Sequence, residues 1–388
     1  MRLELRGVRL VISGLALGSP FFGQGAYASR IIVGLLRRAP DFSFRVLVPE
    51  DFVLPEIPER NIVRLPLGRA PRNSLLRDLY WAHRVLRFAA RLDSETIFHS
   101  PSPIAGFARA PRTAVTIHDC LYRTFTRYYG RSGVRKLVLL ASERYAARSE
   151  LVFTQSEFSK ADLISRTAIA AEKIRILPPW VDERFFAEST AEEVARLRSQ
   201  LHLPQRFWLY LGGFDYRKNV EFLLRAYAQA KRTKTVPTLV LAGAIPPTLN
   251  RAHCDIIGTL AREKLGSDAV LMPGPISAAD LPNLYRAASL LIYPSLMEGF
   301  GLPPAEAMAV NTPVLVADNS SLPEVVPAEE CRFDATNLDD LVSKLRLAAD
   351  NDDRFRAPFS KSFTEACGVP RYLKLLGETF GDEITSTG

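Results

Sequence analysis

The sequence predicts an α/β protein with two domains, each built on a parallel β-sheet, and three observations support this fold class. The chain has 388 residues, enough for two domains of ordinary size. Hydrophobic residues make up 47% of it, enough to fill two cores. Short apolar runs alternate with helical segments along the chain, which is typical of strands covered on both faces by helices.

The first domain is expected to begin with a strand at Val8–Ser13, a loop that includes Gly23 and Gly25, and a helix from about Ala26 to Arg38. A Gly-Gln-Gly turn after a first strand either approaches a ligand or forms an ordinary tight turn. Further strands are expected at 44–48, 61–65, 97–100, 114–117 and 151–154, with helices at 75–92 and after Ser156 or Ser159.

The second domain follows a joint that Pro178 and Pro179 stiffen. Its strands are expected at 207–211, 239–243, 269–271 and 290–293, and its helices at 281–288 and 339–349, with a closing helix at 370–380. The alternation of strand and helix therefore continues to the end of the chain.

The most informative stretch is Pro294–Val316, which predicts a loop, a helix and a strand in succession. Gly299 and Gly301 let the loop approach a ligand closely, and the prolines that follow favour a helix start. Free N–H groups at a helix start attract phosphate, while the carboxylates of Glu298 and Glu306 accept hydrogen bonds from hydroxyls. This layout suits a nucleotide sugar; the alternative is that Glu306 caps its helix and Glu298 is solvated.

The segment EGFGLPPAEAMA (298–309) resembles the E-x7-E signature of the retaining GT-B glycosyltransferases of family 4. TPVLVADNSSLPEVV (312–326) resembles the strand and the donor-covering loop that come next in that family. The resemblance implies a GT-B fold, in which two Rossmann-like domains face each other across a cleft. It implies an acceptor-side domain at 1–180, a donor-binding domain at 181–370, and a segment at 371–388 whose helix returns to the first domain.

GGFDYRKN (212–219) resembles the family's G-x4-R-K-N phosphate loop, which implies that Arg217 and Lys218 hold the donor diphosphate. Cationic side chains there do what a metal does in other families, so neither a metal nor a cofactor is expected. Phe214 stands where some members carry their arginine, which leaves open whether both cations reach the phosphates.

TIHD (116–119) resembles the histidine motif of the family's first domain, which implies that His118 lies beside the donor sugar. A lone histidine after a strand is otherwise a structural group, and His99 is a second candidate. The resemblance further implies that Glu306 holds the ribose and that Glu298 holds the sugar. It places catalytic roles on His118, Glu298, Arg217 and Lys218, and donor contacts on Gly25, Gly213, Gly299, Phe300, Gly301, Leu302 and Glu306.

Two positions depart from the family pattern. Asn311 replaces a glycine, and because asparagine tolerates positive φ we expect the turn to persist. Pro179 and Trp180 replace Asn-Gly, which is expected to alter the hinge or the rim of the pocket.

The charge distribution predicts an anionic partner for the first half of the chain. Residues 1–185 hold 29 Lys and Arg against 17 Asp and Glu, whereas residues 186–388 hold 21 against 25. Arginines alternate with aromatic residues at 121–148, which suits a membrane interface or single-stranded nucleic acid. The resemblance favours a saccharide or lipid-linked acceptor and peripheral contact with an anionic membrane, and argues against nucleic acid.

Four scattered cysteines form no disulfide framework, and with five histidines they indicate no zinc site, which favours the cytoplasm. No apolar run reaches the ~20 residues that cross a bilayer, so membrane contact is expected to be peripheral, at the inner face of the cytoplasmic membrane. Residues 2–28 also imitate a signal peptide, but a first strand followed by a glycine loop explains the whole stretch.

The expected reaction transfers a sugar from a nucleoside diphosphate to a hydroxyl acceptor with retention of configuration. Front-face displacement is expected, because no carboxylate of the first domain is identifiable as a nucleophile. The TIHD and RKN motifs together resemble those of bacterial surface-polysaccharide mannosyltransferases, which implies GDP-mannose as the donor. The alternatives are a GT-B epimerase or hydrolase, which needs no acceptor, and a basic nucleic-acid-binding module.

Overall fold

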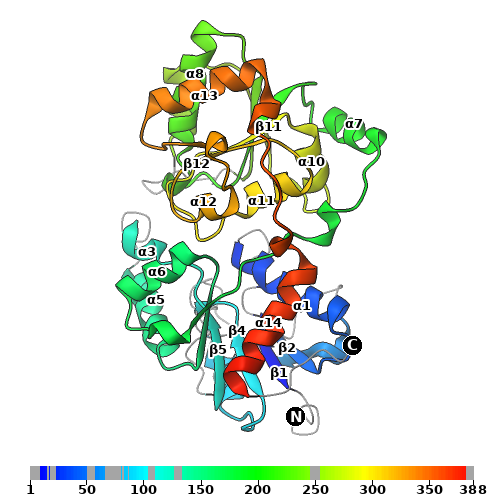
Figure 1. The fold of residues 1–388 in the computed structure, drawn as a ribbon, viewed down its shortest axis with the longest axis vertical. Helices are drawn as coiled ribbons and strands as arrows, with labels where there is room; N and C mark the ends of the chain where they lie inside the picture. The colour runs from blue at the N-terminus through cyan, green and yellow to red at the C-terminus, as the bar shows by residue number, and fades with distance from the viewer. Residues whose placement is uncertain are drawn as a thin grey trace. The chain divides into compact units, whose positions relative to one another are not determined.

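The computed structural model describes residues 9–14, 17, 23–49, 57–65, 80, 83–85, 87–103, 110–125, 133–244 and 254–381. The chain divides into two units (Figure 1). Unit 1 comprises Met1–Cys120, Ser132–Trp180 and Glu365–Gly388, and unit 2 comprises Leu121–Arg131 and Val181–Thr364. The chain leaves unit 1 after Trp180 and re-enters it at Glu365, where the last helix begins.

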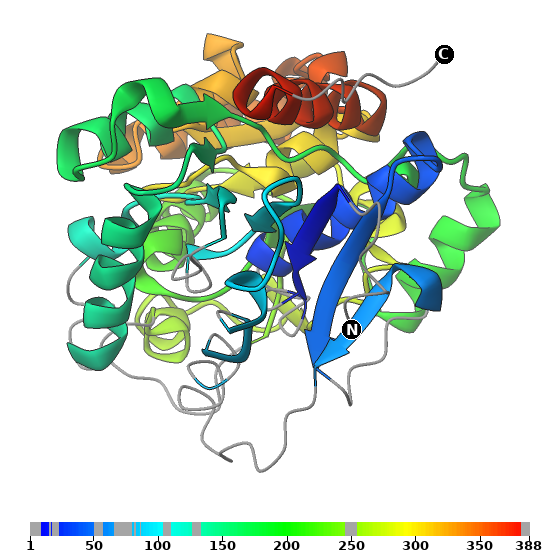
Figure 2. The same ribbon diagram turned by 90° about the horizontal axis from the view of Figure 1, so that it is seen from below.

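Unit 1 is built on seven parallel strands in the order β3-β2-β1-β4-β5-β6-β7. The strands are β1 (Leu10–Ser13), β2 (Phe44–Pro49), β3 (Ile62–Leu65), β4 (Ile97–Ser100), β5 (Arg112–Thr116), β6 (Leu151–Thr154) and β7 (Ile174–Ile176). Its helices include α1 (Gly23–Arg38), α5 (Gly133–Ala146), α6 (Glu157–Arg166) and α14 (Glu365–Phe380). Figure 2 shows β1 and β2 side by side, and α14 packs against α1.

Unit 2 is built on six parallel strands in the order β10-β9-β8-β11-β12-β13. The strands are β8 (Phe207–Leu211), β9 (Thr238–Ala242), β10 (Val270–Gly274), β11 (Leu290–Tyr293), β12 (Val314–Ala317) and β13 (Arg332–Phe333). Its helices include α3 (Leu121–Thr124), α7 (Ala191–Gln200), α8 (Val220–Thr233), α9 (Ile256–Arg262), α10 (Leu281–Ala287), α11 (Leu302–Ala309), α12 (Leu322–Val325) and α13 (Leu338–Asp350).

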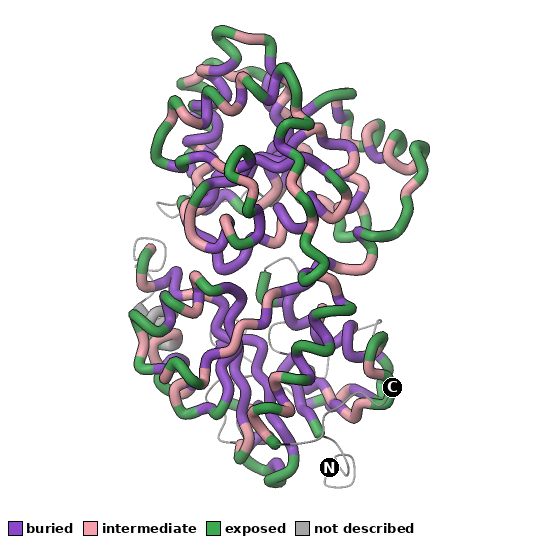
Figure 3. Tube along the Cα trace, viewed as in Figure 1, coloured by how far each residue is buried: buried purple, intermediate pink, exposed green. Residues whose placement is uncertain are grey.

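Both sheets grow outwards in two directions from the first strand of their unit, which is the strand order of a Rossmann-like domain. All residues of β1, β4, β6, β11 and β12 are buried, because helices cover both faces of each sheet (Figure 3). The predicted fold class of two Rossmann-like α/β domains is confirmed. Such sheets gather ligands at the carboxyl ends of their strands, where the loops of interest lie.

Two local predictions had different outcomes. Asn311 has φ 62°, so the turn persists with asparagine in the left-handed conformation, as predicted. Gly23 and Gly25 were expected in a loop, which is wrong: α1 already begins at Gly23, and Gly25 is buried in its first turn. Much of the predicted helix at 75–92 lies outside the described residues.

Trp180, which departs from the family pattern, fits into a slot lined by two glycines. Its side chain is buried, and it lies against Gly34 of α1 and Gly368 of α14. A Cβ atom on Gly368 would stand 2.1 Å from Trp180 Cε3, and one on Gly34 would stand 3.0 Å from Trp180 Cζ2. The indole therefore occupies space that side chains on the two helices would otherwise fill.

Gly368→Ala should destabilise the protein by at least about 1 kcal/mol, because overpacking against the indole exceeds the gain in helix propensity. Urea unfolding followed by circular dichroism measures the change. Cys367→Ala, at an exposed position one residue earlier on α14, is the control and should shift the unfolding free energy by less than roughly 0.5 kcal/mol. Equal stability of the two variants would contradict the packing argument.

Candidate active site

Gly301 shapes the loop between β11 and α11. It has φ 109° and ψ 57°, a conformation that favours glycine, and a Cβ atom there would lie 2.7 Å from Leu322 Cδ2. Two prolines follow in the first turn of α11, and proline has no N–H group. The backbone N–H groups that remain at this helix start are those of Phe300, Gly301 and Leu302. None of these three groups has a hydrogen-bond acceptor within the part of the chain that the structure describes.

Glu298, Arg217 and Lys218 form a buried ion cluster. Glu298 Oε1 lies 2.8 Å from Arg217 Nη1 and 2.7 Å from Lys218 Nζ. The same oxygen accepts a 3.0 Å hydrogen bond from the hydroxyl of Tyr293, the last residue of β11. Lys218 Nζ in turn donates to the Tyr293 oxygen over 2.6 Å. The cluster thus joins the loop after β8 to the loop after β11, and these two strands are neighbours in the sheet.

The cluster keeps the Glu298 carboxylate ionised. Burial alone would raise its pKa, but the charges of Arg217 and Lys218 outweigh burial and hold the pKa at about 2. Burial lowers the pKa of the Lys218 ammonium and Arg217 lowers it further, while Glu298 opposes both. A carboxylate and two cations therefore share a site with little water, where charges act strongly on one another.

The phosphate loop predicted at 212–219 begins where β8 and β9 end close together. Gly243 has φ 149°, and a Cβ atom there would stand 2.0 Å from the carbonyl oxygen of Gly212. The carbonyl of Gly213 accepts a hydrogen bond from Tyr210. A short 3-10 helix, η6 (Tyr216–Lys218), then carries both cations towards Glu298.

Glu306 lies within α11 and is buried. Its Oε2 accepts a 3.1 Å hydrogen bond from the hydroxyl of Tyr285, a fully buried residue of α10. The alternative prediction, that Glu306 caps its helix and Glu298 is solvated, is wrong: Gly301 occupies the N-cap position and Glu298 is buried.

His118 follows β5 in unit 1, and both of its ring nitrogens are engaged. Nε2 donates to the carbonyl oxygen of Pro101 at 3.0 Å, because a carbonyl only accepts, and Nδ1 accepts from Gln155 Nε2 at 2.7 Å. Burial lowers the pKa of the imidazole to about 4, although the bond to Pro101 opposes this. His118 is therefore a neutral ring of fixed tautomer, and it forms a T-shaped ring contact with Tyr27 of α1, with centroids 5.0 Å apart.

The second candidate histidine, His99 on β4, is fully enclosed in unit 1. Its Nδ1 lies 2.7 Å from the hydroxyl of Tyr372 on α14, and its Nε2 lies 3.0 Å from Thr116 Oγ1 on β5. These contacts give His99 a structural role in joining the last helix to the sheet.

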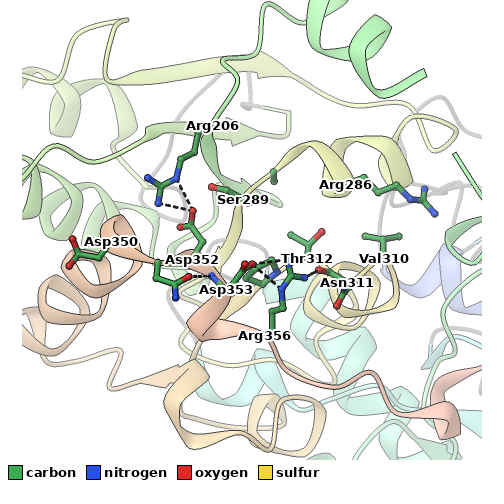
Figure 4. Close-up of a pocket in the computed structure, with 13 residues that line it drawn as sticks. Arg206, Arg286, Ser289, Val310, Asn311, Thr312, Asp350, Asp352, Asp353 and Arg356 are labelled. Carbon is green, nitrogen blue, oxygen red and sulfur yellow. Dashed lines mark hydrogen bonds and ion pairs between the residues drawn. The ribbon is translucent and has the colours of Figure 1, made fainter. Parts of the chain in front are cut away.

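A pocket of about 590 Å³ lies at the opposite edge of the unit 2 sheet, before the strands β8, β11 and β12 (Figure 4). Two of its three arginines are already ion-paired: Arg206 Nε donates to Asp352 over 2.8 Å, and Arg356 lies 2.7 Å from Asp353. The third, Arg286, donates to Ser189 and to two backbone carbonyls. The pocket holds none of the predicted site residues, so we do not assign the substrate to it.

Several residues that support the predicted ones have no clear signal of this role in the sequence. The hydroxyls of Tyr293 and Tyr285 donate hydrogen bonds to Glu298 and Glu306, respectively. The hydroxyl of Ser321 donates to the backbone of the loop between these glutamates. The donor-covering loop at 312–326 was the one signal that could have pointed to Ser321. The sequence pattern predicts the two tyrosines to be ordinary apolar residues of a strand and a helix.

Among the described residues, no three or more His, Cys, Asp and Glu side chains come together as a metal site. Every helix in the described ranges is too short or too polar to cross a membrane.

Two family models match the chain, one on each half. Residues 23–185 match the model described as Glycosyltransferase Family 4, and residues 193–365 match the one described as Glycosyl transferases group 1. The chain belongs to the family 4, group 1 glycosyltransferases.

Among the relatives of this family 4 chain are two mannosyltransferases of Escherichia coli. The serotype-specific mannosyltransferase WbdA is 28% identical over 279 residues, which cover 68% of this chain and 34% of WbdA. The O-antigen chain mannosyltransferase B is 29% identical over 270 residues, which cover 69% of each protein. The chain thus spans about one third of the length of WbdA.

Solved structures show the same fold. Sucrose-phosphate synthase from Thermosynechococcus elongatus superposes with a TM-score of 0.76 at 22% identity, covering 96% of this chain and 99% of that one. HepE from Anabaena, in complex with UDP and glucose, superposes with a TM-score of 0.72 at 17% identity, covering 95% and 99%. The fold of this family 4 chain is GT-B, as predicted.

The ion cluster predicts a pH-dependent stability difference between the wild type and Glu298→Gln. Since the folded pKa of about 2 lies below the ordinary 4.5, the ionised carboxylate stabilises the fold above pH 4.5, and this contribution is lost as the pH falls towards 2. Urea unfolding at pH 7, 4 and 3 should show the difference shrinking. Glu172→Gln, at an exposed position, is the control. A difference that is constant with pH would contradict the assignment.

Proposed function

We propose that this protein is a retaining hexosyltransferase that moves a sugar from a nucleoside-diphosphate sugar to a saccharide or lipid-linked saccharide in polysaccharide or glycoconjugate biosynthesis. The observation that carries the proposal is the buried cluster of Arg217 and Lys218 on Glu298. Two fixed cations in a site with little water stabilise the negative charge that grows on a departing diphosphate. Family membership and the similarity to mannosyltransferases support the same chemistry.

Each predicted site residue has a part in this proposal. Arg217, Lys218 and the amides at the start of α11 receive the diphosphate, without a metal. Glu306, steadied by Tyr285, binds the ribose hydroxyls, and Glu298 with the amides of Gly299 to Gly301 binds the sugar. The placement of His118 beside the sugar rests on the motif resemblance, as do the donor contacts of Gly25 and Gly213. Retention by front-face displacement rests on the resemblance too.

We propose GDP-mannose as the donor, since both relatives from Escherichia coli are named mannosyltransferases. The basic first half of the chain supports an acceptor that is anionic or held at an anionic membrane. A cytoplasmic protein in peripheral contact with the inner face of the membrane fits this acceptor.

The test is thermal stabilisation by GDP, UDP, ADP and their sugars, in buffer that contains EDTA. We expect GDP and GDP-mannose to raise the melting temperature, because a ligand that binds only the folded state stabilises it. A shift that requires added Mg²⁺ would reject the metal-free part of the proposal. No shift with any nucleotide sugar would reject the proposal as a whole.

Lys218→Ala should lower kcat at least about a hundredfold, equal to about 2.7 kcal/mol of lost transition-state stabilisation, whereas Glu306→Ala should mainly raise KM for the donor. Steady-state kinetics with GDP-mannose measures both. Arg206→Ala, which removes a paired arginine from the opposite edge of the sheet, is the control and should leave both constants unchanged. Near-normal activity of Lys218→Ala and Glu306→Ala would contradict the assignment of these residues to the donor site.

A further inference from the structure

Three consecutive residues after β12, Asn319–Ser321, form hydrogen bonds with the loop between β11 and α11, although they lie some twenty positions away in sequence. Asn319 Nδ2 donates to the carbonyl oxygen of Ser295 at 3.1 Å. Ser320 Oγ accepts from the backbone N–H of Glu298 at 3.0 Å. Ser321 Oγ lies 2.9 Å from the carbonyl oxygen of Glu298 and 2.8 Å from that of Phe300, and donates to this pair.

Ser321 makes these contacts in place of its ordinary local role. It occupies the N-cap position of α12, where a serine hydroxyl usually accepts a hydrogen bond from the first turn of the helix. Its side chain makes no such capping bond. The residue is completely buried, and its hydroxyl is used on the loop instead.

Ser320 supports the same interpretation, because its unfavourable backbone conformation accompanies a hydrogen bond to this loop. It has φ 49°, a left-handed conformation that costs a residue other than glycine about 1 kcal/mol. This conformation accompanies the contact between Ser320 Oγ and the amide of Glu298, while Oγ itself donates to Asn319 Oδ1 at 3.0 Å.

The two carbonyls held by Ser321 fix the direction of two amides. In a planar trans peptide the C=O and N–H groups point in opposite directions, and the described chain contains no cis peptide. With the carbonyls of Glu298 and Phe300 turned towards Ser321, the N–H groups of Gly299 and Gly301 point away from it. These amides belong to the loop that the proposed function assigns to the donor.

We propose that Ser321 is a positioning residue for donor binding, which orients the amides of Gly299 and Gly301 by holding the two carbonyls behind them. This inference rests on the proposed function. Without the hydroxyl, two buried carbonyls lose their donor and the loop samples other orientations. The same amides serve substrate and transition state alike, so the loss falls on binding rather than on the chemical step.

The test compares Ser321→Ala with Ser289→Ala. Ser289 Oγ also donates to a backbone carbonyl, that of Phe207, at 3.0 Å, but at the opposite edge of the sheet. With GDP-mannose and UDP-glucose as probes, Ser321→Ala should raise KM about tenfold and change kcat less than about threefold, while Ser289→Ala leaves KM unchanged. Ser321→Cys, which keeps the size but donates weakly, should fall between the wild type and Ser321→Ala.

Amide hydrogen exchange of the peptide covering 294–302, measured without a donor, supplies an independent readout. Exchange there should be faster in Ser321→Ala than in the wild type or in Ser289→Ala. Unchanged exchange in Ser321→Ala, or a KM that rises equally in Ser289→Ala, would overturn the positioning role. A wild type that binds neither probe would reject the proposed function, and the exchange experiment would still decide the role of Ser321.

Discussion

The structure of unit 2 depends on one carboxylate oxygen, Glu298 Oε1, which binds Arg217, Lys218 and Tyr293 at once. Removing the Glu298 carboxylate would leave the buried ammonium of Lys218 without its ion-pair partner, which costs far more than an exposed ion pair gains. The loops after β8 and β11 are therefore fixed to each other by electrostatics as well as by the sheet. Under the proposed function, a diphosphate in this site would meet cations already in place and would compete with Glu298 for them.

The two glutamates of the signature are held in different electrical surroundings, although they lie on one loop and helix. Glu298 faces cations, whereas Glu306 faces the neutral hydroxyl of Tyr285. Gly301 lies between them, and its left-handed backbone turns the chain from the loop into α11. The short spacing of the motif thus gives two carboxylates with separate tasks, one coupled to charge and one to a hydrogen bond.

The sequence predicted most strands of unit 2 well, because a buried parallel strand has a strong local signal, and three of the charged residues that it singled out, Glu298, Arg217 and Lys218, lie together. It could not predict Tyr285, Tyr293 or Ser321, because their roles arise from contacts that form only when the sheet brings separate segments together. Gly25 was placed in a loop because glycine usually breaks helices, yet packing in unit 1 extends α1 over it. The neutral state of His118 likewise depends on Pro101 and Gln155, which the TIHD motif does not contain.

The glycine-lined slot around Trp180 brings three distant segments of the sequence into contact, so their residues can be exchanged with those of a relative only as a set. A chimera that restored the family's usual Asn-Gly at 179–180 would leave a void the size of an indole between α1 and α14. Filling that void would require larger residues at 34 and 368, whereas a bulkier residue at either position alone would be rejected by the native ring. Grafts between this chain and its relatives must therefore carry residues 34, 180 and 368 together.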